Sequence, residues 1–436
     1  MARKGCKKTK TGCLTCKIRK IKCDETKPSC RCCNDTGRKC DGYTVQASLE
    51  SKIRSDLGRH GSNSASERRA LQYFYEYAAP RLSGPRRPVF WTHFVMQLSE
   101  SEPIVKHSLL AISHLYEARE IQSTPSIRPS LALQYYNASI KGLKAVEDQS
   151  LVLVVCILFT CIELLLSNNE TAIQHCNHGL AILENYNNDN PWILEHLLPI
   201  FRRLSVLPLL IGKPLADSAF APVLRPVVPT RFESIEDAQS MLDDIFKQLM
   251  LLRHWKQKGT HFDVVKERSC IDSLLHQCKE LIQNLDIDST SQADCASAGP
   301  QALMQMRFQL CQVCFDMVFP EDQADSNEKN IHDFRKMITQ ASAFNKLRTI
   351  RVPRFVFELA FSPILSFIVM ECKCLELRLA ALRLIRVLGA ERESLFESHN
   401  LYTLGRQRIQ TEHGVILDIA DCPQDFILDS DLYSLI

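Results

Sequence analysis

Six cysteines in the first 40 residues follow one spacing pattern twice. Each half has the spacing C-x2-C-x6-C, six residues separate the halves, and the cysteines are Cys13, Cys16, Cys23, Cys30, Cys33 and Cys40. A segment of roughly 30 residues buries too little apolar surface to offset its chain entropy. Thiols spaced this tightly, in a chain that opens without an apolar signal segment, favour structural zinc over a disulfide framework. The pattern therefore predicts a domain that is held together by metal.

The number of cysteines constrains how zinc is bound. Two tetrahedral ions need eight ligands, so six thiolates suffice only if two of them bridge both ions. The twofold repeat makes the first cysteine of each half, Cys13 and Cys30, the natural bridging pair. No histidine precedes His60, which leaves thiolates as the only soft ligands here. Cys6 and Cys32 lie outside the repeat, and we interpret both as spare thiols.

Positive charge is concentrated in the same segment. Residues 1–43 contain nine Lys and four Arg against three Asp and one Glu, a net charge of +9, whereas the whole chain carries +3. Six thiolates and two zinc ions would leave about +7 on the folded domain. A compact charge of this size attracts a polyanion, so this segment is suited to nucleic acid and the rest of the chain is not.

Four basic residues in the first half of the repeat are the candidate DNA-binding residues: Lys17, Arg19, Lys20 and Lys22. A solvated face or a nuclear localisation patch would explain such a run more simply. The position of these residues favours the DNA-binding interpretation, because Lys17, Arg19 and Lys20 follow Cys16 within a predicted short helix that the metal would hold rigid. Contact of Lys or Arg with guanine O6 and N7 is the commonest specific base contact.

The segment from Gly12 to Tyr43 closely resembles the zinc binuclear cluster DNA-binding domain of fungal transcription factors. The six spacings, the basic run, Pro28 between the halves and the closing Gly42-Tyr43 all agree. This resemblance implies a small Zn2Cys6 domain with two short helices over residues 8–43, with two zinc ions per chain. In that arrangement one ion is held by Cys13, Cys16, Cys23 and Cys30, and the other by Cys30, Cys33, Cys40 and Cys13.

The same resemblance implies how the domain would bind DNA. In this family the carboxyl end of the first helix enters the major groove and reads a CGG triplet. The residue that makes the main guanine contacts corresponds to Lys20, with Arg19 beside it.

Residues 44–68 are polar, with Gly58, Gly61 and a Ser/Asn cluster, and we interpret them as a flexible linker. Many relatives have a dimerising coiled coil here. The apolar residues of this segment recur at four-residue steps and so depart from a heptad pattern. They span barely three helical turns, which is too short for a stable coiled coil.

From residue 69 to 436 apolar residues recur mostly at helical steps, and alternating strand patterns are scarce. The clearest sets are Val105, Leu109, Ile112 and Tyr116 behind Pro103; Leu133, Tyr136, Ile140, Leu143 and Val146; and Ile173, Cys176, Leu180 and Leu183. We therefore predict a large all-α domain of stacked helices. Polar stretches at 288–300 and 320–330 are predicted to be surface loops.

The apolar run 151–166 is shorter than the ~20 residues that a bilayer requires and contains Glu163, so we expect a buried helix and no membrane partner. The chain starts with basic residues and without an apolar h-region, which predicts a soluble, intracellular and reduced protein. In that environment the cysteines outside the first segment are expected to act mostly as small hydrophobic residues. Cys311 and Cys314 form an isolated C-x2-C pair, which we interpret as core.

A second resemblance concerns the large domain. Residues 67–84, 90–117 and 372–386 resemble stretches of the fungal-specific regulatory domain that follows the zinc cluster in many such factors. It covers much of 69–436 and implies a regulatory scaffold rather than an enzyme. The sequence contains no Gly-rich phosphate loop, no G-x-S-x-G and no H-E-x-x-H.

These patterns predict a nuclear, zinc-dependent, sequence-specific DNA-binding regulator of RNA polymerase II transcription that acts through CGG-type sites. The alternative is a zinc-stabilised nuclear or cytosolic interaction scaffold that reads no DNA sequence. A third class, an α-helical enzyme with an appended zinc module, lacks a catalytic constellation. Target genes, the sign of regulation, any effector, half-site spacing and the choice between monomer and homodimer stay open.

The acidic segment 412–436 has no Lys or Arg, and apolar residues are interleaved with its carboxylates. It resembles an activation segment, which would contact the transcription machinery, and a helix that docks on the large domain is the alternative.

Overall fold

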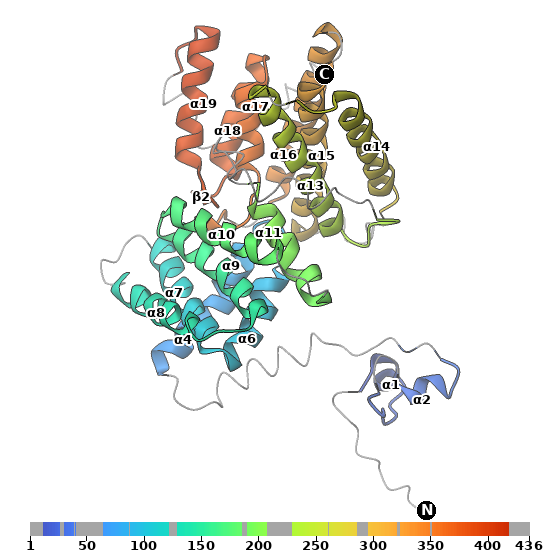
Figure 1. Ribbon diagram of the computed structural model, residues 1–436, viewed down its shortest axis with the longest axis vertical. Coiled ribbons are helices and arrows are strands. Elements are labelled where there is room, and N and C mark those ends of the chain that lie inside the picture. Colours follow the sequence, from blue (N-terminus) through green and yellow to red (C-terminus); the bar gives the residue numbers. More distant parts are fainter. Residues whose placement is uncertain are drawn as a thin grey trace, which may run out of the picture. The chain divides into compact units, whose positions relative to one another are not determined.

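The computed structural model describes residues 12–26, 30–38, 40, 64–86, 88–121, 129–184, 190–206, 229–259, 261–285, 295–320, 323–348 and 351–417. The chain divides into two compact units, Met1–Arg69 and Ala70–Ile436, which are described separately (Figure 1).

The first unit contains two short helices, α1 (Leu14–Ile18) and α2 (Arg31–Asn34). Each helix begins directly after the first cysteine of one half of the repeat. Among the described residues of this unit, the buried cluster consists of cysteines: Cys13, Cys16, Cys23, Cys30 and Cys33, with Cys32 and Cys40 packed against them. A core of sulfur atoms confirms the predicted small, metal-stabilised fold.

The predicted linker at 44–68 ends earlier than expected, because helix α4 (Ala65–Tyr73) already begins at Ala65. The Oγ atom of Ser64 accepts a hydrogen bond from the backbone N–H of Glu67 (3.2 Å), the N-capping contact of an S-x-x-E sequence. Residues 44–63 lie outside the described residues.

The second unit is mostly helical, as predicted. After α4, its α-helices are α5 (Ala79–Leu82), α6 (Val95–Ser101), α7 (Pro103–Glu120), α8 (Pro129–Leu143), α9 (Gln149–Leu165), α10 (Asn169–Glu184), α11 (Leu198–Leu204), α13 (Ile235–Gln257), α14 (Val264–Gln283), α15 (Cys295–Val318), α16 (Gln323–Leu347), α17 (Ser362–Glu371), α18 (Leu375–Leu388) and α19 (Ser398–His413). The described residues of this unit also include short π-helical segments: η1 (Phe74–Ala78), η2 (Phe90–Phe94) and η3 (Ile193–Leu197).

Neighbouring helices pair along the chain: α7 packs on α8, α9 on α10, α15 on α16 and α17 on α18. Within this unit Figure 1 shows two groups, one of α4–α11 in blue to green and one of α13–α19 in yellow to red. Helices α11 and α13 pack against each other where the groups meet.

A three-stranded sheet of very short strands interrupts the helices, which the sequence did not predict. Strand β1 (Phe355–Val356) pairs in parallel with β2 (Arg392–Glu393), and β2 pairs antiparallel with β3 (Phe396–Glu397). The fully buried Arg392 donates from Nη1 to Glu397 (2.8 Å) and to Ser167 Oγ (3.0 Å), the second of which lies between α9 and α10. The sheet thereby links the two helix groups.

Helices are present where the three sets of periodic apolar residues predict them. We compare each set with the residues that its helix buries. Helix α7 begins at Pro103, where the missing N–H needs no partner, and buries Val105, Leu109, Ile112 and Tyr116. In α8 the prediction is partly wrong: Leu133 and Ile140 are exposed, and the helix ends before Val146. The buried side of α8 carries Ala132, Tyr136 and Ser139 instead.

The apolar run at 151–166 forms α9, which is buried along most of its length, as predicted. Within the ranges described above, the protein has no helix that combines the length and apolar character needed to cross a bilayer.

The two predicted loops extend too far, because α15 begins at Cys295 and α16 at Gln323. Residues 288–294 and 321–322 of these loops lie outside the described residues. Proline 300 lies inside α15 even though it cannot donate a backbone hydrogen bond. Contacts with other helices surround this position: Gly299 lies close to the Phe344 ring, and Gln239 Nε2 donates to the carbonyl of Pro300 (2.9 Å).

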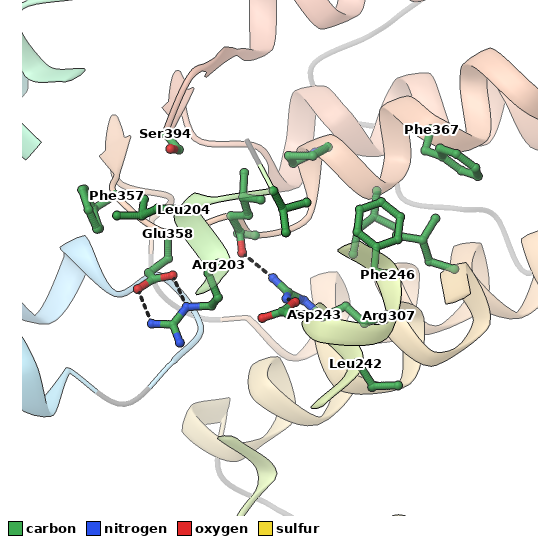
Figure 2. Close-up of a pocket in the computed structure, with 16 residues that line it drawn as sticks. Arg203, Leu204, Leu242, Asp243, Phe246, Arg307, Phe357, Glu358, Phe367 and Ser394 are labelled. Atoms are coloured by element: carbon green, nitrogen blue, oxygen red, sulfur yellow. Dashed lines mark hydrogen bonds and ion pairs between the residues drawn. The ribbon is translucent and has the colours of Figure 1, made fainter. Parts of the chain in front are cut away.

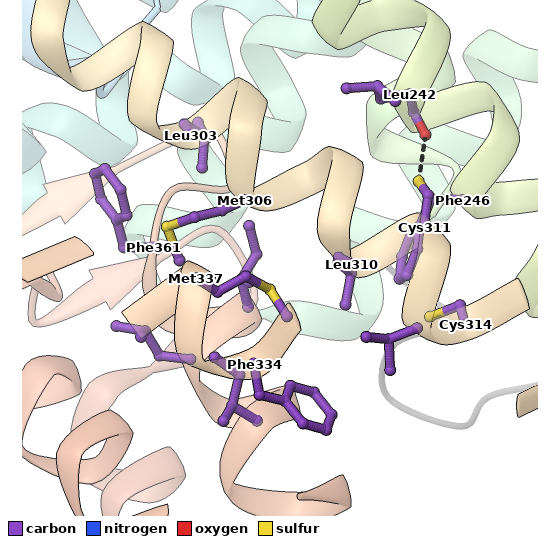
Figure 3. Packing of buried hydrophobic residues seen from close by; sticks show 14 of the residues in the cluster. Leu242, Phe246, Leu303, Met306, Leu310, Cys311, Cys314, Phe334, Met337 and Phe361 are labelled. Carbon is purple, nitrogen blue, oxygen red and sulfur yellow. Dashed lines mark hydrogen bonds between the residues drawn. The ribbon is translucent and has the colours of Figure 1, made fainter. Parts of the chain in front are cut away.

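A continuous apolar cluster fills the α13–α19 group (Figure 3). Cys311 and Cys314 are buried in it, and the Cys311 Sγ lies 3.4 Å from the carbonyl oxygen of Leu242. The interpretation of this C-x2-C pair as core is confirmed.

Candidate zinc cluster and nucleic-acid interface

The first unit brings all six repeat cysteines together in two overlapping groups. The Sγ atoms within each group lie within 4.8 Å of one another, the groups being Cys13, Cys16, Cys23 and Cys30, and Cys13, Cys30, Cys33 and Cys40. Cys13 and Cys30 belong to both groups, and their Sγ atoms are 3.6 Å apart. Cys32 belongs to neither, and its Sγ lies 3.5 Å from the carbonyl oxygen of Lys22.

The sulfur geometry fits tetrahedral zinc. Zn–S bonds of about 2.3 Å place the sulfurs of one tetrahedron about 3.8 Å apart. The Cys16 and Cys30 sulfurs of the first group are 3.7 Å apart, and the Cys13 and Cys33 sulfurs of the second group are 3.8 Å apart. The two sets therefore have the ligand type, number and spacing for two zinc ions that share two thiolates.

Burial at this site opposes ionisation of the thiols in the absence of metal. Burial raises the pKa of the Cys13 thiol to about 12, and it raises the pKa of Cys16 and Cys30 as well. Thiolates at these positions need nearby positive charge, which zinc supplies by coordination. Backbone N–H groups also donate hydrogen bonds to the sulfur atoms. Those of Cys13 and Glu25 donate to Cys23 Sγ, and both N···S distances are 3.4 Å.

The two halves are also joined by Asp24, which the sequence analysis did not identify. Its carboxylate oxygens accept hydrogen bonds from the backbone N–H groups of Arg31 and Cys32 at the start of α2, and both N···O distances are 3.1 Å. A hydrogen bond from Thr26 and these two N–H groups lower the pKa of Asp24. The cap comes from seven residues upstream, so no local capping pattern reveals it.

Both helices end with the same backbone turn. The N–H of Ile21 donates to the carbonyl of Cys16 (3.1 Å), and the N–H of Arg38 donates to the carbonyl of Cys33 (3.0 Å). In each turn the residue four positions after the second cysteine has a left-handed backbone: Lys20 with φ +57° and Gly37 with φ +65°. This is the position where helices favour glycine. Lys20 therefore bears a conformational cost of roughly 1 kcal/mol that Gly37 avoids.

This turn corrects the predicted location of the basic residues. Helix α1 ends at Ile18, so Arg19 and Lys20 lie in the turn after it rather than inside the helix. Lys17 lies within α1, and its side chain is outside what the structure describes. Lys20 and Lys22 are exposed.

Arg19 makes a contact within the first unit, and its predicted contact with DNA stays a prediction. Its Nη1 donates to Thr36 Oγ1 (3.1 Å), and that hydroxyl is in turn 2.9 Å from the carbonyl oxygen of Cys32. In this conformation Arg19 joins the turn after α1 to the second half of the repeat, and the exposed Lys20 is the freer of the two basic side chains.

Comparison with known proteins agrees with this geometry. Residues 11–49 match the family model of the fungal Zn(2)-Cys(6) binuclear cluster domain, whereas the sequence predicted 8–43. A domain of this family binds two zinc ions, and the two cysteine groups fit that number.

Two curated proteins are similar over longer stretches. The chain is 28% identical over 293 residues to the aspercryptin biosynthesis cluster-specific transcription regulator of Emericella nidulans, which covers 56% of this chain and 47% of that protein. It is 32% identical over 131 residues to an uncharacterized transcriptional regulatory protein of Schizosaccharomyces pombe, 24% of each chain. The chain thus spans about half the length of the first relative and about a quarter of the second. No solved structure matches significantly.

Proposed function

We propose that this protein is a zinc-dependent DNA-binding transcription factor that acts in the nucleus through CGG-type sites on genes transcribed by RNA polymerase II. The observation that carries the proposal is the pair of overlapping cysteine groups, with exposed Lys20 at the end of the first helix. The zinc cluster match and the two transcription regulators among its relatives support it, and neither relative is named as an enzyme.

In this proposal the six repeat cysteines are the zinc ligands, with Cys13 and Cys30 bridging both ions. Zinc supplies the positive charge and the cross-links that hold the two halves in one geometry. The chain's own residues do the rest: Asp24 fixes the start of α2, and Arg19 ties the turn after α1 to Thr36.

DNA reading is assigned to the turn after α1. The net charge of +9 on residues 1–43 provides sequence-independent attraction to phosphates. Lys20 is exposed at the carboxyl end of α1, where its ammonium group can donate to guanine O6 and N7 in the major groove. Lys17 and Lys22 are assigned to phosphates, and residues 69–436 to a regulatory domain.

Selection of bound duplexes from a random library tests this function directly. The purified full chain should enrich CGG triplets, because a lysine that contacts guanine discriminates among base pairs. The same selection in the presence of a zinc chelator is the control, and it should enrich nothing. One enriched triplet per site indicates a monomer, and two at a fixed spacing indicate a homodimer.

Binding without enrichment of any triplet would contradict the proposal. It would favour the alternative, a zinc-stabilised interaction scaffold whose basic residues serve nuclear import or nonspecific contacts.

The acidic segment is proposed to contact the transcription machinery, and its boundary needs correction. Glu412 belongs to α19 and pairs with the buried Arg378, with Nη1 and Oε2 2.7 Å apart. It is therefore part of the helical domain and not of a separate segment. The acidic residues from Asp418 to Asp431 lie outside the described residues.

We expect residues 414–436, fused to an unrelated DNA-binding domain, to activate a reporter gene, because the segment combines carboxylates with apolar side chains. A matched fusion with Asp425, Asp429 and Asp431 changed to Asn should lose most of the activity. Equal reporter levels with and without the segment would show that it does not activate transcription.

A further inference from the structure

The charged side chains around the cavity of the second unit are explained by the fold. This cavity of about 50 Å³ lies where the two helix groups meet, and it has room for about three or four water molecules. Figure 2 shows two ion pairs in its wall: Arg203 donates to both carboxylate oxygens of Glu358, and Arg307 contacts Asp243. Each positive group in the wall therefore has a negative partner.

The surface of the first unit, by contrast, carries an apolar side chain that the fold does not explain. Among the described residues of this unit, the large apolar side chains exposed to water are Ile18 and Ile21, which are 76% and 40% exposed. Ile21 follows the left-handed residue that ends α1, a position where such turns often have an apolar residue. Ile18 is the last residue of α1, and water surrounds most of its side chain.

The second half of the repeat shows that the turn does not need an apolar residue at the position of Ile18. Cys30 lies 17 positions after Cys13, so Asp35 in the second half corresponds to Ile18. Asp35 is exposed, has a helical backbone (φ −64°, ψ −22°) and lies two positions before the left-handed Gly37. The same turn thus forms with an exposed carboxylate in place of isoleucine.

Ile18 lies close to the residue that is assigned to base reading. It is two positions before Lys20, and two residues of chain span at most about 7 Å. Base pairs follow one another at about 3.4 Å, so Ile18 would lie within roughly two base pairs of the guanines that Lys20 contacts. The apolar group that unmodified base pairs present in the major groove is the C5 methyl group of thymine. The other groups there donate or accept hydrogen bonds, which an isoleucine side chain cannot do.

We propose that Ile18 contacts the C5 methyl group of a thymine beside the CGG triplet and so extends the sequence that the first unit reads. The contact removes exposed apolar surface from water on both molecules. Lys20 reads guanine through hydrogen bonds, and Ile18 reads thymine through apolar contact. At the equivalent position of the second half, the carboxylate of Asp35 would be repelled by DNA phosphates. This inference rests on the proposed function, because it concerns the same DNA site.

Replacement of thymine by uracil tests this contact, because it removes the C5 methyl group alone. The duplexes contain one CGG triplet, with an A·T or T·A pair at each of the two positions on either side. The full chain, loaded with zinc, is titrated with the thymine and uracil forms of each duplex. At one of these positions uracil should weaken binding by about three- to fivefold, which corresponds to the loss of one buried methyl group.

Two variants assign the thymine preference to one side chain. Ile18→Ala should bind the thymine and uracil duplexes with equal affinity and should keep its preference for CGG over scrambled triplets. Ile21→Ala, at the other exposed isoleucine, is the matched control and should still bind thymine duplexes more tightly than uracil duplexes. The readout is a ratio of two affinities, so a general weakening of DNA binding in either variant does not affect it. The comparison on the wild-type chain decides even if a variant fails to fold.

Equal affinity of the wild-type chain for thymine and uracil at every position would overturn this inference. A thymine preference that persists in Ile18→Ala would overturn it as well. Both results leave the proposed function intact as long as CGG duplexes bind more tightly than scrambled ones. A wild-type chain that binds CGG and scrambled duplexes equally would overturn the proposed function and this inference together.

Discussion

Chelation of zinc should unfold the first unit completely and leave the large helical unit folded. The buried cluster of the first unit consists of cysteine side chains, so sulfur and metal replace the apolar core that a segment of this size lacks. Structural zinc contributes on the order of 10–16 kcal/mol of folding free energy, which exceeds the stability of most complete domains. Hydrogen exchange of the full chain should show loss of protection in α1 and α2 alone, and DNA binding should be lost with it.

Metal analysis of variants separates ligands from bystanders. The wild-type chain should contain two zinc ions. Cys30→Ser should reduce zinc binding at both sites, because Cys30 belongs to both cysteine groups. Cys32→Ser is the matched control, since Cys32 is adjacent to Cys33 but lies in neither group, and it should retain both ions. A stoichiometry of one, or protection of α1 and α2 that survives the chelator, would contradict the bridged cluster.

The cysteine groups could be predicted from the sequence because metal ligation is a local constraint. Spacings of two and six residues fix which sulfurs can meet, and the repeat indicates which two are shared. The buried helix at 151–166 was predictable for a similar reason: its length and apolar composition leave few alternatives.

Other features depend on contacts that no sequence pattern contains. The cap of α2 comes from Asp24, upstream of the second half, and α15 continues through Pro300, whose carbonyl accepts a hydrogen bond from Gln239 of α13. The buried ion pair of Arg86 and Asp243 has the same origin, because its members are 157 residues apart and neither lies in a motif. Such pairs become recognisable only when the fold brings their charges together.

The end of α1 illustrates how a rule of sequence analysis fails at the position that we propose to read DNA. Left-handed residues that end a helix are expected to be glycine, and Gly37 follows this expectation in the second half. The first half has Lys20 at the equivalent position, so the sequence predicts a helix that continues through it. Backbone strain at Lys20, beside the unstrained equivalent Gly37, supports the proposal that the lysine side chain has a function.

Replacement of Lys20 should therefore remove sequence reading from DNA binding. Lys20→Ala should lower affinity for CGG duplexes by on the order of 1–3 kcal/mol and affect scrambled duplexes little, because it removes base contacts. Lys17→Ala or Lys22→Ala should instead weaken binding to all duplexes about equally and reduce the salt dependence by about one unit, since each removes a phosphate contact. Titration of both duplexes at several salt concentrations measures these effects together.

Lys20→Gly provides the decisive comparison with Lys20→Ala. Glycine removes the same side chain but adopts the left-handed backbone without strain, so the first unit should become more stable by roughly 1 kcal/mol. If Lys20 acts through base contacts, both variants should lose the same affinity for CGG. Recovery of CGG affinity in Lys20→Gly would show that the alanine variant lost only the shape of the turn. Equal losses on CGG and scrambled duplexes would mean that Lys20 contributes charge alone, and the interaction scaffold would then be the better account of this protein.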